Sequence, residues 1–221
     1  MSDKREVLTA LIDQGLLPLF YRDSIEESIS ISRALYQAGI RVFEYTNRGS
    51  AALENFKYLL DVRDTEMPDL RLGIGTVRTL SDANAFINAG ADFIVAPVVT
   101  PSVAEACNHA GLLWIPGCMT PTEIQLAQDN NALLIKIFPA NILGPAFVSS
   151  IKELFPGQLF MPTGGVEIDM DNLTGWFNSG VCAVGMGSKL ISKEIIENKH
   201  YDHLTELTVQ VLQLIKSCKS H

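Results

Sequence analysis

The chain has 221 residues, of which 47% are hydrophobic and 19% charged, so it is long and apolar enough to form one sizeable core. A net charge of −8 without any basic stripe argues against a nucleic-acid surface, and no run approaches the ~20 apolar residues of a membrane span. The first residues lack the apolar core of a secretory signal and the four cysteines are widely spaced, so we expect reduced thiols in a cytoplasmic protein.

Short apolar runs alternate with amphipathic stretches of helical period along the chain. An initial helix is predicted over residues 4–14. The apolar runs predict strands over residues 16–20, 41–45, 70–75, 93–96, 113–116, 133–138, 159–161 and 182–185. Amphipathic helices are predicted between and after these strands, over residues 24–38, 51–62, 81–89, 102–110, 122–128, 145–154, 170–178 and 203–216.

Local signals support these boundaries. Ser24, followed three residues later by Glu27, predicts a capping box at the start of the second helix. Left-handed glycine caps are expected after four helices, at Gly39, Gly90, Gly111 and Gly180. The alternation predicts an α/β fold: a single (β/α)8 TIM barrel over residues 1–221, with an extra N-terminal helix closing its floor. A doubly wound open sheet is the alternative.

Lys136 lies in the run 132–140, which otherwise predicts a buried strand. A buried ammonium group is costly unless it is paired or loses its proton, so the pKa of this lysine is expected to be depressed. An uncharged lysine is a nucleophile for carbonyl carbons, and the chemistry that needs one is Schiff-base formation. The alternative is a lysine whose amine reaches solvent from a short edge strand.

Polar and proline residues collect at the ends of the predicted strands, where a (β/α)8 barrel carries its chemistry. Glu44 lies on the second strand with Arg48 just after it, and Thr76 follows the third strand. Pro97 and Pro116 mark the ends of the fourth and fifth strands. Glu44 alone is also consistent with a hydrogen-bonded strand carboxylate, Arg48 with a surface charge and Thr76 with a helix cap. Their coincidence at equivalent points of one repeat indicates a common site.

Glycine-rich loops follow the seventh and eighth predicted strands, each just before a helix. The first loop contains Gly164 and Gly165, and the second contains Gly187 and Ser188. Loops of this kind present backbone N–H groups to an anion and form the usual phosphate site of a (β/α)8 barrel. An acidic chain can bind an anion in this way because the site uses local peptide dipoles. Simple tight turns are the alternative.

With these residues in place, the chain resembles the family of 2-keto-3-deoxy-6-phosphogluconate and 4-hydroxy-2-oxoglutarate aldolases, which are class I (lysine) aldolases. The resemblance runs over about residues 17–190. It rests on the motifs Phe43-Glu44-x-Thr46-x-Arg48, Gly73-x-Gly75-Thr76, Ile115-Pro116-Gly117, Lys136-x-Phe138-Pro139-Ala140, Pro162-Thr163-Gly164-Gly165 and Gly187-Ser188. It implies a (β/α)8 barrel that assembles as a homotrimer and needs neither a metal nor another cofactor.

The resemblance also implies a role for each candidate residue. Lys136 would form the imine with the C2 ketone of the substrate, and Glu44 would be the proton shuttle. The substrate carboxylate would be bound by Arg48, Thr76 and Thr163. The distal phosphate would be bound by Gly164, Gly165, Gly187 and Ser188. The pocket would be lined further by Pro97, Pro116 and Phe138.

Two departures from the family pattern lie near the expected mouth of the site. Asn141 stands where the family commonly has Glu, and Asn47 stands where many members have an apolar residue. Neither position carries chemistry that the mechanism requires, so both concern the substrate more than the reaction. The glycine loops favour a phosphorylated 2-keto-3-deoxy acid over an unphosphorylated 4-hydroxy-2-oxo acid.

Three other functions stay open at this point. A metal-dependent aldolase would need histidine and carboxylate ligands at strand ends, but the histidines fall on predicted helices or in the tail, at His109, His200, His203 and His221. A sugar-phosphate isomerase or synthase would use the glycine loops without an imine. A noncatalytic phosphometabolite-binding protein would bind its ligand without turnover.

Overall fold

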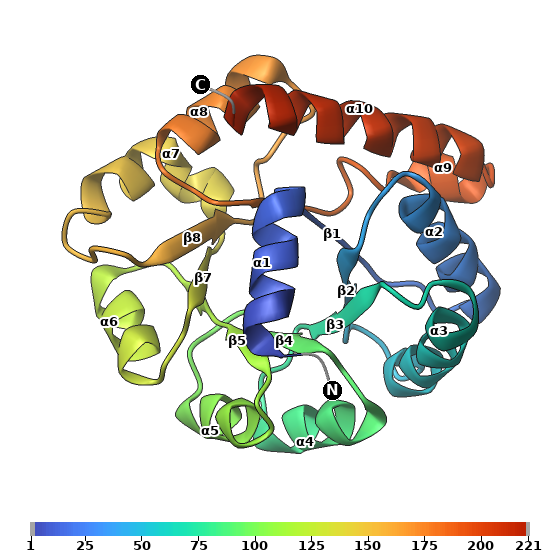
Figure 1. Ribbon diagram of the computed structural model, residues 1–221, viewed down its shortest axis with the longest axis horizontal. Coiled ribbons are helices and arrows are strands. Elements are labelled where there is room, and N and C mark those ends of the chain that lie inside the picture. The colour runs from blue at the N-terminus through green and yellow to red at the C-terminus, as the bar shows by residue number, and fades with distance from the viewer. Residues whose placement is uncertain (1–2, 220–221) are drawn as a thin grey trace.

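Parallel strands and helices alternate in the computed structural model, which describes residues 3–219 (Figure 1). The strands are β1 (Leu16–Phe20), β2 (Val42–Thr46), β3 (Arg71–Gly75), β4 (Phe93–Val95), β5 (Leu113–Ile115), β6 (Gly117–Cys118), β7 (Leu134–Ile137), β8 (Leu159–Pro162) and β9 (Val184–Met186). The helices are α1 (Lys4–Gln14), α2 (Ile25–Gln37), α3 (Ala52–Glu66), α4 (Leu80–Ala89), α5 (Pro101–His109), α6 (Pro121–Asp129), α7 (Ala140–Ile151), α8 (Met170–Asn178), α9 (Lys193–Glu197) and α10 (Tyr201–Lys219).

The predicted strands and helices are confirmed, with three differences. The strand predicted over 113–116 ends earlier, because Pro116 lacks an N–H group and separates β5 from β6. Helix α7 begins at Ala140, and its backbone leaves the helical conformation at Gly144, just before the predicted start at Pro145. The short helix α9 is absent from the prediction. His221 lies outside the described residues.

Helix α2 begins as predicted but lacks the predicted capping box. The Ser24 side chain accepts a hydrogen bond from the Glu27 backbone N–H at 3.2 Å, which caps the helix. The Glu27 carboxylate pairs instead with Arg22, with an Nε–Oε2 distance of 2.6 Å. The capping-box prediction at this helix is therefore wrong in its second half. The four predicted glycine caps all have positive φ, at Gly39, Gly90, Gly111 and Gly180.

The strands form two parallel sheets. One has six strands in the order β5-β4-β3-β2-β1-β9, and the other has three in the order β6-β7-β8. The chain is thus an α/β protein with parallel strands, as predicted, but its strands do not pair in the single closed ladder of the predicted barrel. A single parallel bridge between Thr163 and Gly185 joins the end of β8 to β9.

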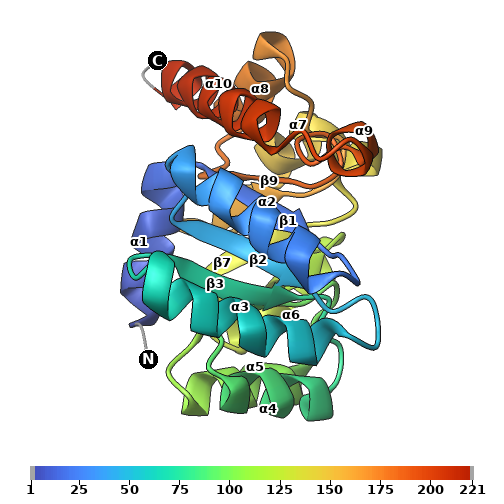
Figure 2. The same ribbon diagram turned by 90° about the vertical axis from the view of Figure 1, so that its right-hand side faces the viewer.

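The strands lie at the centre of the molecule with helices arranged around them, and α1 crosses one end (Figures 1 and 2). Side chains on β2 alternate between two buried clusters, because successive residues of a strand point to opposite faces. Val42 belongs to the inner cluster, which Val7 and Leu11 of α1 also join. Phe43 belongs to the cluster between strands and helices. The extra N-terminal helix therefore packs on the inner core as predicted.

No helix within residues 3–219 is both long and apolar enough to cross a bilayer. All four cysteines are free, and Cys107, Cys118 and Cys218 are buried.

Candidate active site

Lys136 lies on β7, paired in register with Gly117 of β6 and Met161 of β8. Only 6% of the residue is exposed. Its Nζ lies 4.9 Å from the centre of the Phe138 ring, so the amine is inside the protein and does not reach solvent from an edge strand. Burial is the main cause that lowers the pKa of Lys136. The charge of Glu44 raises this pKa, and the positive charge of Arg48 lowers it further.

Glu44 lies on β2 and is 1% exposed. Its Oε1 atom lies 1.6 Å from the position that a Cβ atom would take at Gly75. The carboxyl group thus occupies the space of a side chain that Gly75 lacks, which explains why β3 ends in glycine. Burial raises the pKa of Glu44, and the positive charges of Lys136 and Arg48 partly offset this.

Burial therefore favours the neutral form of both groups, a free amine on Lys136 and a protonated carboxyl on Glu44. A neutral amine can attack a carbonyl carbon, and a neighbouring neutral acid can supply the proton that the leaving oxygen needs. A lowered pKa increases the fraction of Lys136 that carries the neutral, nucleophilic amine at a given pH.

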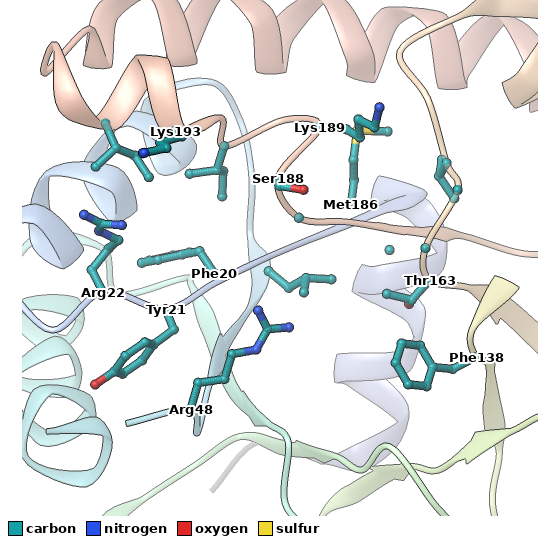
Figure 3. A pocket seen from close by; sticks show the side chains of 18 residues that line it. Phe20, Tyr21, Arg22, Arg48, Phe138, Thr163, Met186, Ser188, Lys189 and Lys193 are labelled. Atoms are coloured by element: carbon teal, nitrogen blue, oxygen red, sulfur yellow. The ribbon is translucent and has the colours of Figure 1, made fainter. Parts of the chain in front are cut away.

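A cavity of about 430 Å³ opens beside this pair (Figure 3). Its lining includes seven of the predicted site residues: Arg48, Phe138, Thr163, Gly164, Gly165, Gly187 and Ser188. The Arg48 guanidinium group points into the cavity from the loop after β2, facing Phe138 and Thr163 (Figure 3). Residues far apart in the sequence are thereby assembled around one space.

The glycine loop after β8 has a backbone that only glycine adopts readily. Gly164 and Gly165 have φ angles of 93° and 73°. A Cβ atom at Gly165 would lie 2.7 Å from the Cβ of Asn141, at the start of α7. Asn141 therefore packs directly against the glycine loop, which gives one of the two departures from the family pattern a definite position.

Five predicted residues are not among the residues that line the cavity: Glu44, Lys136, Thr76, Pro97 and Pro116. Glu44 and Lys136 are buried, and Phe138 both lines the cavity and lies against the Lys136 amine. Thr76 follows β3 with a positive φ of 63°. The roles predicted for Thr76, Pro97 and Pro116 stay predictions.

Three cations in the cavity lining are absent from the sequence-based prediction: Arg22, Lys189 and Lys193. Lys189 and Lys193 pair with Glu167 and Glu197, at 2.9 and 3.3 Å. The strand-end rule could have found Arg22, which follows β1 closely, whereas Lys193 lies on the short helix α9 that periodicity does not reveal. Arg22 is also paired, with Glu27, so each of these three cations has a carboxylate partner.

Within residues 3–219, no three His, Cys, Asp or Glu side chains are grouped so that they could hold a metal ion. The described histidines lie at His109 in α5, at His200 and at His203 in α10.

The fold and site define a parallel α/β protein with a buried lysine and a buried glutamate near a glycine-lined cavity. The chain matches the KDPG and KHG aldolase family model over residues 7–207. The chain therefore belongs to the KDPG and KHG aldolase family.

Individual relatives agree with this assignment over nearly their whole length. The 2-dehydro-3-deoxy-phosphogluconate aldolase of Treponema pallidum (strain Nichols) is 32% identical over 211 residues, which cover 95% of this chain and 97% of that protein. The KHG/KDPG aldolase of Escherichia coli (strain K12) is 28% identical over 200 residues, covering 90% and 91%. The KDPG aldolase of Legionella pneumophila, solved with pyruvate captured at low pH as a covalent carbinolamine intermediate, superposes with a TM-score of 0.84 at 27% identity, covering 95% and 98%.

Proposed function

We propose that the chain cleaves 2-keto-3-deoxy-6-phosphogluconate, or a close 2-keto-3-deoxy or 4-hydroxy-2-oxo acid, to pyruvate and an aldehyde such as glyceraldehyde 3-phosphate or glyoxylate. As a member of its family the chain is a class I aldolase, an aldehyde-lyase. The observation that carries the proposal is the buried Lys136 amine, whose pKa is lowered beside the buried Glu44 carboxyl. The covalent pyruvate adduct of the Legionella pneumophila relative supports a Schiff-base route.

In the proposed reaction Lys136 Nζ attacks the C2 ketone of the substrate, and Glu44 gives a proton to the oxygen that leaves as water. The protonated imine then accepts the electron pair of the C3–C4 bond and becomes a neutral enamine, while Glu44 takes the C4 hydroxyl proton and the aldehyde leaves. Protonation of the enamine at C3 and hydrolysis of the imine release pyruvate and restore the amine. Each proton transfer by a positioned group typically contributes ~10²–10⁴-fold in rate.

Arg48 is proposed to bind the C1 carboxylate, with Thr76 and Thr163 adding hydrogen bonds. A planar guanidinium group matches a carboxylate with two parallel hydrogen bonds, and Arg48 points into the cavity beside Thr163. The distal phosphate is assigned to the two loops of Gly164, Gly165, Gly187 and Ser188, which line the same cavity.

We further propose that residues 1–221 form one closed (β/α)8 domain. The two sheets adjoin at two places. At one of them the bridge between Thr163 and Gly185 joins β8 to β9, and at the other only Pro116 separates β5 from β6. A homotrimer is proposed as well, supported by membership of the aldolase family whose resemblance implies that assembly. Light scattering after size exclusion tests the trimer. The free cysteines support a reducing, cytoplasmic location.

A panel of 2-keto-3-deoxy acids, with and without a terminal phosphate, tests the proposed reaction through the release of pyruvate. Borohydride reduction in the presence of pyruvate tests the covalent step, and mass spectrometry should find the adduct on the peptide that contains Lys136. An isomerase or synthase would form no adduct, a binding protein would show no turnover at high enzyme concentration, and a metal-dependent aldolase would lose activity with EDTA.

Ser188→Ala is expected to raise the KM for a phosphorylated substrate about tenfold, the effect of losing one hydrogen bond to a charged group. An unphosphorylated substrate should be cleaved with nearly unchanged KM. Steady-state kinetics on both substrates provide the measurement. Ser150→Ala, on the exposed surface of α7, is the control. Equal effects on both substrates would assign the second loop another role.

The pH dependence of imine formation is expected to shift in opposite directions in two variants. Only the neutral amine attacks pyruvate, so the trapping rate rises with pH through the pKa of Lys136. Glu44 raises this pKa and Arg48 lowers it, so Glu44→Gln should move the midpoint to lower pH and Arg48→Met to higher pH. Initial rates of borohydride trapping at saturating pyruvate measure the midpoint. Shifts of the same sign in both variants would contradict the assignment.

A further inference from the structure

Thr46 is a buried polar residue that the proposed mechanism leaves unused. It ends β2, is 1% exposed, and its Oγ1 atom has no hydrogen-bond partner. Leaving a buried hydroxyl group unpaired costs free energy, so such a group calls for an explanation. Thr46 alternates along β2 with Val42 and Glu44 and therefore faces the interior of the strand assembly with them.

The strand register brings this hydroxyl group close to the Glu44 carboxyl. Thr46 is the register partner of Gly75, so their side-chain positions face the same way on neighbouring strands, which lie on the order of 5 Å apart. The Glu44 carboxyl fills the side-chain position of Gly75, with Oε1 1.6 Å from the missing Cβ. The carboxyl group, which comes from the same strand as Thr46, therefore lies at the side-chain position next to Thr46 on the neighbouring strand.

The carboxyl also has an unpaired atom. Glu44 Oε2 is buried without a hydrogen-bond partner, like Thr46 Oγ1. The charged groups that act on Glu44 are Lys136 and Arg48. The backbone carbonyl of Thr46 accepts a hydrogen bond from the Arg48 N–H at 3.0 Å, so this residue also holds the turn that presents Arg48. One donor and one acceptor, both buried and unpaired, thus lie on adjoining positions.

We propose that Thr46 is a positioning residue, whose hydroxyl group donates a hydrogen bond to Glu44 Oε2, directly after rotation about χ1 or through one water. The bond fixes the carboxyl in the orientation from which it exchanges protons with the substrate adduct on Lys136. This inference rests on the aldolase function proposed above. The hydroxyl group makes no bond to the substrate, so its effect belongs to the rate of turnover and not to binding.

The matched variants are Thr46→Val, which keeps the shape and loses the hydroxyl group, and Thr46→Ser, which keeps the hydroxyl group and loses a methyl. Thr46→Val should lower kcat by about 10- to 100-fold, the scale of a lost hydrogen bond to a charged group, with little change in KM. Thr46→Ser should stay within about threefold of wild type. Thr208→Val, which removes another buried hydroxyl group in α10, is the control and should leave kcat unchanged.

A second measurement separates positioning from packing. In a Glu44→Gln background, Thr46→Val should cause no further loss of kcat, because a residue that acts through Glu44 has nothing left to position. The acid limb of the kcat profile should also move to higher pH in Thr46→Val, because the charged carboxylate loses a donor. Full activity of Thr46→Val, or additive losses in the double variant, would overturn the proposal.

Two further comparisons keep the outcome clear. If Thr46→Val fails to fold by near-UV circular dichroism, Thr46→Ala and Thr46→Ser form a second pair for kcat, and equal losses in both would overturn the proposal. If wild-type protein forms no borohydride adduct with pyruvate, the aldolase mechanism itself fails. A wild-type adduct together with an unaffected Thr46→Val variant refutes the role of Thr46 alone.

Discussion

Replacing Lys136 by methionine is expected to abolish pyruvate release, with kcat falling by about 10⁴-fold or more, as when a covalent nucleophile is lost. Methionine is close to the unbranched apolar stem of lysine and lacks the amine, so it fills most of the same space on β7. Borohydride trapping with pyruvate should leave this variant unlabelled. Lys57→Met, at an exposed position of α3, is the control and should keep full turnover and full labelling. Residual labelling of Lys136→Met at the wild-type level would refute the Schiff-base role.

The same variant should fold at least as stably as wild type at neutral pH. Burial lowers the pKa of Lys136, so the unfolded chain binds this proton more readily than the folded protein. The lysine therefore costs stability at every pH below its unfolded pKa, and the cost disappears only as the pH rises toward that value. Denaturant midpoints at neutral pH measure the difference. Loss of activity with retained stability separates a chemical role from a structural one.

The strands could be predicted from the sequence because strands of a parallel sheet are buried on both faces and appear as continuous apolar runs. An ionisable residue inside such a run is conspicuous, as Lys136 is, whereas Glu44 is predicted from the polar residues that collect near the strand ends. Their burial in the structure agrees with that interpretation.

Pairing between distant strands could not be predicted in the same way. The end of β8 meets β9 through one bridge between Thr163 and Gly185, two residues that are far apart in the sequence. Local signals also compete with tertiary partners. The Glu27 carboxylate fits a capping box by its spacing, but Arg22 is close enough in the folded chain to pair with it instead. Sequence spacing does not show whether the Glu27 carboxylate binds the helix N-terminus or Arg22.

Partners that fill the space of an absent side chain are also invisible in the sequence. Gly75 is part of a recognisable motif, but the sequence does not show why a glycine is needed there. The structure shows that the Glu44 carboxyl occupies the position of its missing side chain. The same geometry links Thr46 to Glu44, although each residue alone is an ordinary strand residue. The sequence therefore predicts the proposed reacting groups Lys136 and Glu44, but not which side chains lie against them.

Glu44→Gln is expected to lower kcat by about 10²–10⁴-fold, because glutamine has the same shape but cannot carry protons. Pyruvate should still form the imine, so trapping with borohydride should persist, although more slowly. Pre-steady-state trapping together with steady-state kcat and KM distinguishes the two effects. Glu54→Gln, at an exposed position of α3, is the control. A loss confined to KM would show that Glu44 binds substrate without transferring protons.

Gly75→Ala tests the same group from the neighbouring strand. Gly75 does not have a positive φ, so alanine is compatible with its backbone, yet the new methyl group would meet the Glu44 carboxyl, whose Oε1 lies 1.6 Å from that position. The carboxyl must then move, and kcat should fall toward the level of Glu44→Gln. In a Glu44→Ala background the methyl group has space, so Gly75→Ala should have little further effect on kcat. Equal losses of kcat in both backgrounds would mean that Gly75 is needed for the structure of β3 and not for the placement of the Glu44 carboxyl group.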